Sequence, residues 1–233
     1  MKIFAEFVRS AASARDLPAD GLPELALVGR SNVGKSSVIN ALTRQRIART
    51  SATPGKTRLA NIYRVTRGSS KPFHLVDLPG FGFAKGRDSE REFAELTNAY
   101  FGARPDRLAA LLLVDARHPG LENDRQAWTW LASVSDEHAL VATKIDKLAR
   151  GQRIRAMREI ESVFDSPVLP VSAVTGEGLD ELWKLIDRLL NSRNPNPSLS
   201  RPSPPRATAR SLPTNPPPAT KPSAPSQVEA PKK

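Results

Sequence analysis

The sequence predicts an α/β fold in which a mostly parallel sheet is flanked by helices. Between residues 22 and 190, short apolar stretches alternate with longer amphipathic ones. Most of the short stretches are continuously apolar, as is typical of strands buried on both faces. A glycine-rich turn also joins the first such stretch to a helical pattern. Alternating strands and helices of this kind favour a parallel sheet.

Each element can be placed from its own pattern. Six strands are expected, at residues 24–29, 61–66, 72–77, 108–116, 139–143 and 168–172. Helical patterns cover residues 35–42, 89–101, 123–133, 153–164 and 178–190. In the last of them, Leu182, Leu185, Ile186 and Leu189 form an apolar stripe with Trp183 beside it. That stripe predicts a helix packed on the core.

The composition changes near Asn194 and divides the chain. Twelve of the 21 prolines lie beyond this point, where large apolar residues are almost absent. Such a segment cannot bury enough surface to offset the entropy of ordering. We therefore expect a folded domain at residues 22–193, an N-terminal segment at residues 1–21 that packs on it, and a disordered, basic, proline-rich tail at residues 194–233.

Charge and composition restrict the partners. The net charge is +11, of which the tail carries +5 and residues 1–193 carry +6. This excess points to a polyanion such as RNA, although basic residues also serve solubility. The absence of cysteine excludes disulfides and thiolate metal sites and agrees with the cytoplasm. The longest apolar run has seven residues, 108–114, whereas a membrane-spanning helix needs roughly 20. We therefore expect a cytoplasmic protein with no membrane contact.

The turn after the first strand has the pattern of a phosphate-binding loop. Its residues are Gly29, Arg30, Ser31, Asn32, Val33, Gly34, Lys35 and Ser36, which match G-x-x-x-x-G-K-[ST]. Inward-pointing backbone N–H groups and the positive end of the following helix can hold phosphates. We expect Lys35 to reach the β- and γ-phosphates and the Ser36 hydroxyl to bind Mg²⁺. A chance glycine-rich turn is the alternative, which the strand before and the helix after disfavour.

A second motif closes the third expected strand. Its residues are Asp77, Leu78, Pro79 and Gly80. An acid at a strand end downstream of a phosphate loop is placed to hold Mg²⁺ through water. Gly80 is expected to donate its N–H to the γ-phosphate.

Two further motifs indicate guanine as the base. The first consists of Thr143, Lys144, Ile145 and Asp146, and the second of Val171, Ser172 and Ala173. The Asp146 carboxylate can accept two hydrogen bonds, which matches N1–H and N2–H₂ of guanine but not the N1 acceptor of adenine. The stem of Lys144 can pack on the ring, and backbone N–H groups of the second motif can approach O6. Thr143 stands where asparagine is commoner in GTPases.

The loop TPGKTR, residues 53–58, lies between the first helix and the next strand. A threonine there can coordinate Mg²⁺ and sense the γ-phosphate. Thr57 is the first choice for this role and Thr53 the second. Along the chain, the five motifs lie at residues 29–36, 53–58, 77–80, 143–146 and 171–173. Together and in this chain order, they predict a domain that switches with guanine nucleotides.

The stretches "GRSNVGKSSVINALT", "TPGKTR", "DLPGFGFAKG", "DARHP" and "TKID" resemble the EngB (YihA/YsxC) family of ribosome-biogenesis GTP-binding proteins. This family is part of the TrmE-Era-EngA-EngB-Septin-like GTPase superfamily. The resemblance covers roughly residues 3–191 and implies a Ras-like P-loop GTPase with a six-stranded sheet. It also implies binding of GTP and GDP with Mg²⁺, assembly of the large ribosomal subunit, and a requirement in cell division and septation. We expect a monomer.

The resemblance also assigns roles to residues. It implies that Gly55, Lys56, Thr57, Arg58 and Leu59 form the first switch motif and contact GTP. Ser36 and Thr57 become the Mg²⁺ ligands, and the phosphate loop and the Asp77, Asp146 and Ser172 motifs complete the pocket. Phe81 and Phe83 depart from the family, which often has tyrosines there; this leaves nucleotide binding intact and bears on a partner contact.

Catalysis is expected to be slow without a partner. Ras-type enzymes orient the attacking water with a glutamine after D-x-x-G, and here that position is Phe81. Lys35 and Thr57 are the other residues expected to serve hydrolysis. Related GTPases with asparagine at the position of Asn32 use K⁺ beside the phosphates. Asn32 is thus a candidate K⁺ ligand, or it simply bonds the loop backbone.

Basic residues gather near the two switch motifs. Arg44, Arg46, Arg49, Lys56 and Arg58 surround the first, and Lys85 and Arg87 follow the second. A further set, Arg150, Arg153, Arg155 and Arg158, lies on an expected helix and is equally explained as a solvated face. With no RNA-binding motif of the RRM or KH kind in the sequence, we expect recognition of ribosomal RNA by shape and backbone.

Two other functions remain open from the sequence. One is a nucleotide-insensitive RNA-binding assembly protein whose nucleotide site is only structural. The other is a P-loop kinase of small molecules or nucleosides, which "TKID" disfavours.

Overall fold

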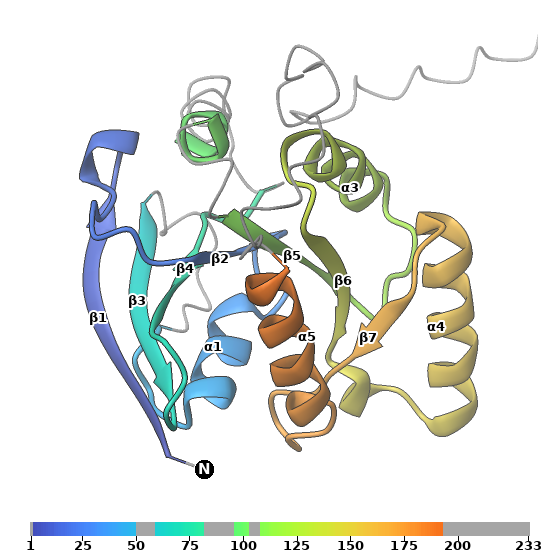
Figure 1. The fold of residues 1–233 in the computed structure, drawn as a ribbon. Coiled ribbons are helices and arrows are strands. Elements are labelled where there is room, and N and C mark those ends of the chain that lie inside the picture. The colour runs from blue at the N-terminus through green and yellow to red at the C-terminus, as the bar shows by residue number, and fades with distance from the viewer. Residues whose placement is uncertain (1, 50–58, 82–95, 103–107, 193–233) are drawn as a thin grey trace, which may run out of the picture.

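The computed structural model describes residues 2–49, 59–81, 96–102 and 108–192 (Figure 1). Its strands are β1 (Ile3–Ala11), β2 (Glu24–Gly29), β3 (Ala60–Arg67), β4 (Phe73–Asp77), β5 (Leu108–Asp115), β6 (His138–Thr143) and β7 (Val168–Pro170). Its helices are α1 (Lys35–Thr43), α3 (Glu122–Val134), α4 (Arg150–Phe164) and α5 (Leu179–Asn191), and residues 96–102 are also helical. Short 3-10 helices lie at Ala14–Asp16 and Ile145–Lys147.

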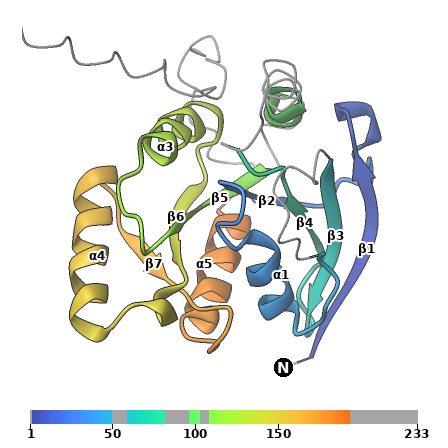
Figure 2. The same ribbon diagram turned by 180° about the vertical axis from the view of Figure 1, so that it is seen from behind.

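All strands belong to one sheet with the order β1-β3-β4-β2-β5-β6-β7. The pairs from β4 through β2, β5 and β6 to β7 are parallel, whereas β1 and β3 are antiparallel to their neighbours. The mostly parallel α/β sheet is therefore confirmed, and each of the six expected strands is present. Figure 1, and Figure 2 from behind, show β1 at one edge of the molecule and α4 at the other.

The expected strand number was wrong by one, because the N-terminal segment itself adds a strand. β1 pairs with β3 from Ile3 opposite Arg67 to Ala11 opposite Ala60, with a register shift between Phe7 and Arg9. The shift breaks the regular alternation of apolar residues that would have marked a strand in the sequence.

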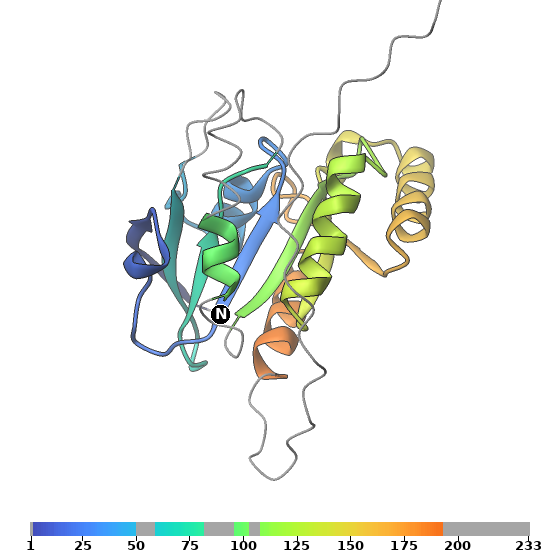
Figure 3. The same cartoon turned by 90° about the horizontal axis from the view of Figure 1, so that it is seen from above.

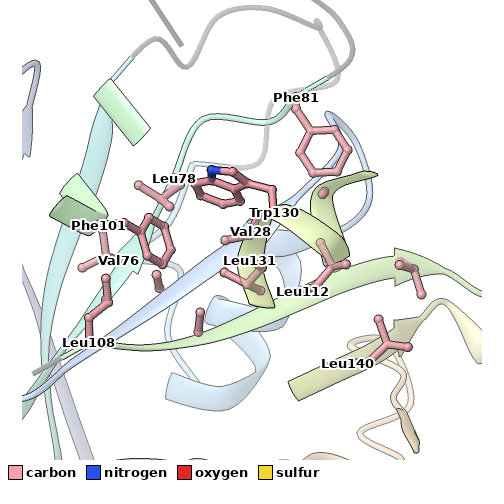
Figure 4. Close-up of a cluster of buried hydrophobic side chains, with 14 of the residues drawn as sticks. Val28, Val76, Leu78, Phe81, Phe101, Leu108, Leu112, Trp130, Leu131 and Leu140 are labelled. Atoms are coloured by element: carbon pink, nitrogen blue, oxygen red, sulfur yellow. The ribbon is translucent and has the colours of Figure 1, made fainter. Parts of the chain in front are cut away.

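Two apolar layers cover the sheet, and β5 shows why. All its residues are buried; Leu108, Ala110, Leu112 and Val114 face one layer, and the residues between them face the other. The first layer is closed by α3, α4 and the helical residues 96–102, and Figure 4 shows part of it. The second is closed by α1 and α5. Seen from above, α3 and α4 lie side by side, away from β1 (Figure 3).

The apolar stripe of α5 lies in the second layer. Leu182, Ile186 and Leu189 are buried, Leu185 is half-buried, and Trp183 packs edge-on against Phe73. Within the described ranges, no helix is both long and apolar enough to cross a bilayer.

Several expected features lie outside the described residues. These are Thr53 and residues 55–58, Phe83, Lys85, Arg87, the start of the helix expected at 89–101, and the tail at 194–233.

Candidate functional site

The phosphate loop connects β2 to α1. Gly34 caps α1 with a φ of 112°, and no side chain caps the helix. The φ favours glycine, and the uncapped first turn leaves N–H groups available to an anion. Asn32 also has a left-handed backbone, with a φ of 62°. The loop is thus shaped to turn backbone donors toward a phosphate.

Three charged or polar side chains meet beneath this loop. Lys35 is 8% exposed, and its Nζ donates to the Gly29 carbonyl oxygen at 3.2 Å. The Ser36 hydroxyl donates to Oδ2 of Asp77 at 3.0 Å. Burial lowers the pKa of Lys35, although the negative charge of Asp77 acts to raise it. Burial likewise raises the pKa of Asp77, opposed by Lys35 and the Ser36 hydrogen bond.

This arrangement fits Mg²⁺. The hydroxyl and carboxylate oxygens that meet at 3.0 Å are hard donors of the kind Mg²⁺ prefers. The buried carboxylate also lacks solvent to stabilise its charge. Ser36 would hold the ion directly and Asp77 through water, and the ion would supply positive charge that offsets the negative charge of the nucleotide.

The motif that begins at Asp77 lies directly against the phosphate loop. The Ser31 N–H donates to the Phe81 carbonyl at 3.0 Å, and the Phe81 N–H donates to the Gly29 carbonyl at 3.3 Å. A Cβ on Gly80 would lie 2.6 Å from the Ser31 Cα. Only glycine therefore permits this close approach.

The last residue of β6 and the residue that follows it also hold the phosphate loop. The Thr143 hydroxyl lies 2.7 Å from the Val33 carbonyl oxygen and 3.1 Å from that of Val114. The Lys144 Nζ donates to the Asn32 carbonyl at 2.6 Å. Thr143 is 2% exposed, so the two contacts of its hydroxyl are made away from water.

The expected guanine-binding residues are brought together by a small hydrogen-bond network. The Ser172 hydroxyl donates to Oδ1 of Asp146 at 2.8 Å and accepts from the N–H groups of Val174 and Thr175. Burial acts to raise the pKa of Asp146, but the hydrogen bonds from Ser172 and Lys147 outweigh it, so the pKa is lowered. Asp146 is therefore an ionised acceptor held in one orientation.

Two charged clusters at this edge of the sheet were given no role from the sequence, although Asp115 and Arg117 lie in the stretch DARHP. Asp115, at the end of β5, accepts from the Arg117 Nε and Nη2 and, at 2.9 Å, from the Lys144 Nζ. Burial acts to raise the Asp115 pKa, and these bonds hold it well below its usual range. An acid at a strand end was the available signal, as at Asp77.

The second cluster is a single ion pair that joins the phosphate loop to α3. The Arg30 Nε lies 3.1 Å from both carboxylate oxygens of Asp124. Asp124 is 1% exposed, and burial raises its pKa to about 6 although Arg30 opposes the shift. No pattern in the sequence links these two residues, which are 94 positions apart.

The structure thus gathers three of the predicted motifs around the phosphate loop. Residues 77–80 contact it directly, residues 143–146 hold it by hydrogen bonds, and residues 171–173 join through Asp146. Of the first switch motif only Leu59 is described; it is 39% exposed, and residues 55–58 lie outside the described ranges.

Comparison with known proteins agrees with this geometry. A family model described as "50S ribosome-binding GTPase" matches residues 24–144. A protein of Alkaliphilus oremlandii named "Probable GTP-binding protein EngB" is 39% identical over 198 residues, which cover 82% of this chain and 93% of the relative.

Solved structures share the fold at lower identity. The crystal structure of a probable GTP-binding protein engB has a TM-score of 0.58 at 22% identity and covers 72% of this chain and 99% of the other. Era in complex with MgGDPNP and a segment of 16S ribosomal RNA has a TM-score of 0.62 at 22% identity and covers 80% and 60%. The extent and identity of the match to the curated relative show that this chain belongs to the EngB family of GTP-binding proteins and that its domain is a P-loop GTPase.

Proposed function

We propose that this GTPase is a switch that acts in assembly of the large ribosomal subunit. Loaded with GTP, it binds the immature subunit, and it leaves after hydrolysis. The observation that carries the proposal is the pairing of the phosphate loop with the residues that follow Asp77. Because Ser31 and Gly29 are hydrogen-bonded to Phe81, a change at the γ-phosphate is passed from the phosphate loop to the residues that follow Asp77.

In this proposal the nucleotide is bound by the residues predicted from the motifs. Residues 29–36 hold the phosphates, with Lys35 at the β- and γ-phosphates, and Asp146 with residues 171–173 selects guanine. Mg²⁺ is held by Ser36 and Thr57 and, through water, by Asp77. Support comes from the converging Ser36 and Asp77 oxygens and from the ionised, oriented carboxylate of Asp146.

Hydrolysis is slow unless the partner assists. Phe81 is 6% exposed and packs in the first apolar layer, on the side where Trp130 lies (Figure 4). It carries no group that can orient water, so a residue or surface of the ribosomal partner supplies that role. We expect hydrolysis to accelerate when large subunits are added.

A K⁺ ion assists the reaction beside Asn32. The Asn32 side chain is exposed, and its amide makes no hydrogen bond to any residue that the structure describes. It is thus available to a cation at the phosphates. Faster hydrolysis in K⁺ than in Na⁺, lost in Asn32→Ala, is the expected result; equal rates in the two salts would remove the idea.

The ribosomal partner is supported by charge and by relatives. The chain carries a net charge of +11, and its family model is described as a 50S ribosome-binding GTPase. Basic groups near the nucleotide site allow contacts with RNA phosphates to follow the nucleotide state. Depletion in the host, followed by ribosome profiles and microscopy, tests the assembly role and the septation role together.

The direct test is co-sedimentation with purified large subunits, in GDP and in a non-hydrolysable GTP analogue, at two salt concentrations. We expect the analogue to favour binding and Lys35→Ala to abolish the preference. Lys184→Ala is the matched control, because Lys184 is an exposed lysine of α5 and its loss changes the net charge equally. Binding that ignores the nucleotide and disappears at modest salt would instead indicate an RNA-binding protein with a structural nucleotide site.

A further inference from the structure

A basic groove lies on the outer face of α1. It has a volume of about 770 Å³ and is lined by Arg44, Arg46 and Arg49, which we call the arginine groove. Ala173 and Val174, in the loop that follows β7, also line it. The groove therefore extends from the expected guanine-binding loop to the end of α1.

No acid among the described residues forms an ion pair with any of the three arginines. All three are exposed. The described residues that line the groove include no acid. By contrast, Arg30 and Arg153 are paired with Asp124 and Glu177. Unpaired guanidinium groups around one groove attract an anion with several charges.

The backbone beneath these arginines is held in place. The Asn40 side chain donates to the Ala48 carbonyl and accepts from the Ala48 N–H, both at 2.8 Å. Ala48 is 4% exposed, and Ile47 packs against the second apolar layer. With residues 47 and 48 turned inward, Arg46 and Arg49 project outward. The groove is thus pre-organised, which lowers the entropic cost of binding.

We propose that the arginine groove binds the sugar-phosphate backbone of ribosomal RNA. This inference rests on the proposed function and names the surface through which it operates. Guanidinium groups form paired hydrogen bonds with phosphate oxygens, and three of them around one groove match a polyanionic strand. Arg49 is the last described lining residue before the stretch at residues 53–58, which is expected to sense the γ-phosphate and follows it closely in the sequence.

The test compares two triple variants of the full chain in binding to purified large subunits with the GTP analogue. The first replaces Arg44, Arg46 and Arg49 by glutamine. The matched control replaces three exposed arginines of α4 by glutamine, so the change in net charge is the same. These are Arg150, Arg155 and Arg158. Affinities are measured between about 50 and 200 mM salt, where phosphate contacts dominate the salt dependence.

We expect the groove variant to bind at least about tenfold more weakly. The slope of log affinity against log salt is negative, and its magnitude should fall by about 2 to 3, because each lost phosphate contact removes roughly 0.7 to 0.9. The α4 control should stay within about twofold of the wild-type protein, and GDP affinity should be unchanged in both.

Three results would overturn the proposal. An equal loss in both variants would mean that the groove has no special role, because net charge or the α4 arginines contribute as much. A loss of GDP affinity in the groove variant would assign the groove to the nucleotide site. Weaker binding with an unchanged salt slope would indicate a protein partner in place of RNA. A different result separates the two proposals. If the wild-type protein binds large subunits equally well in GDP and in the GTP analogue, while the groove variant binds more weakly, the proposed switch is refuted and the proposed RNA-binding groove is supported.

Asn40→Ala removes the two hydrogen bonds that hold the backbone at Ala48 and leaves the net charge of the groove unchanged. We expect faster hydrogen exchange at the Ala48 amide, together with RNA binding weakened by about threefold and unchanged GDP affinity. Faster exchange with undiminished RNA binding would show that the held backbone contributes nothing.

Discussion

Replacing Thr143 by valine removes the hydroxyl that links β6 to the phosphate loop and keeps the shape of the side chain. The hydroxyl lies 2.7 Å from the Val33 carbonyl oxygen, in a site where Thr143 is 2% exposed. Leaving a buried carbonyl without its partner costs about 1–3 kcal/mol. For a domain of this size, that loss lowers the melting temperature by about 2–12 °C.

Nucleotide binding should weaken with stability in this variant. Val33 lies at the centre of the phosphate loop, so a loosened loop must be reordered by the ligand, and we expect GDP affinity to fall about threefold to tenfold. Thermal unfolding and GDP titration measure the two effects. Thr143→Ser is the control, since it keeps the hydroxyl and loses only a methyl group. A valine variant as stable as the wild-type protein, with equal GDP affinity, would refute the reasoning.

Three further predictions follow from single contacts. Gly80→Ala places a Cβ 2.6 Å from the Ser31 Cα, so the chain must shift at a cost of about 1–3 kcal/mol. The melting temperature should then fall by about 2–12 °C, and a variant that unfolds at the wild-type temperature would contradict this. Ser172→Ala removes the 2.8 Å hydrogen bond to the Asp146 carboxylate, so GDP affinity should fall about tenfold. The affinity for inosine diphosphate, which lacks the 2-amino group, should fall less. Equal losses of affinity for the two nucleotides would argue against a role of Ser172 in base selection. The third concerns pH: burial raises the pKa of Asp124 to about 6 from 3.8, so the folded state holds this proton more tightly than the unfolded state. Its contribution to stability is therefore fully present below pH 3.8 and is lost by about pH 6. Relative to Asp124→Asn, the wild-type protein should lose roughly 3 kcal/mol over that window in urea unfolding, and a difference that ignores pH would exclude the effect.

Much of the fold could be predicted because the relevant signals are local. The apolar runs of β2, β4, β5 and β6 mark strands buried on both faces, and they occur where the structure has them. The loop between Gly29 and Ser36 is equally local, since its glycines and its flanking elements are adjacent in the chain. β1 was missed because its bulge near Phe7 disrupts the alternation from which strands are recognised.

The same distinction between local and long-range signals applies to the functional site. The sequence by itself determined which residue types could hold phosphate and select guanine, because that chemistry depends on side chains at fixed local spacing, as in the motifs of Lys35 and Asp146. Only the tertiary structure decided how the motifs are joined. The bonds from Thr143 to Val33, from Lys144 to Asn32 and from Arg30 to Asp124 depend on strand order and on which face of each helix meets the sheet. Those relations arise when distant segments bury a common core, so no local pattern carries them.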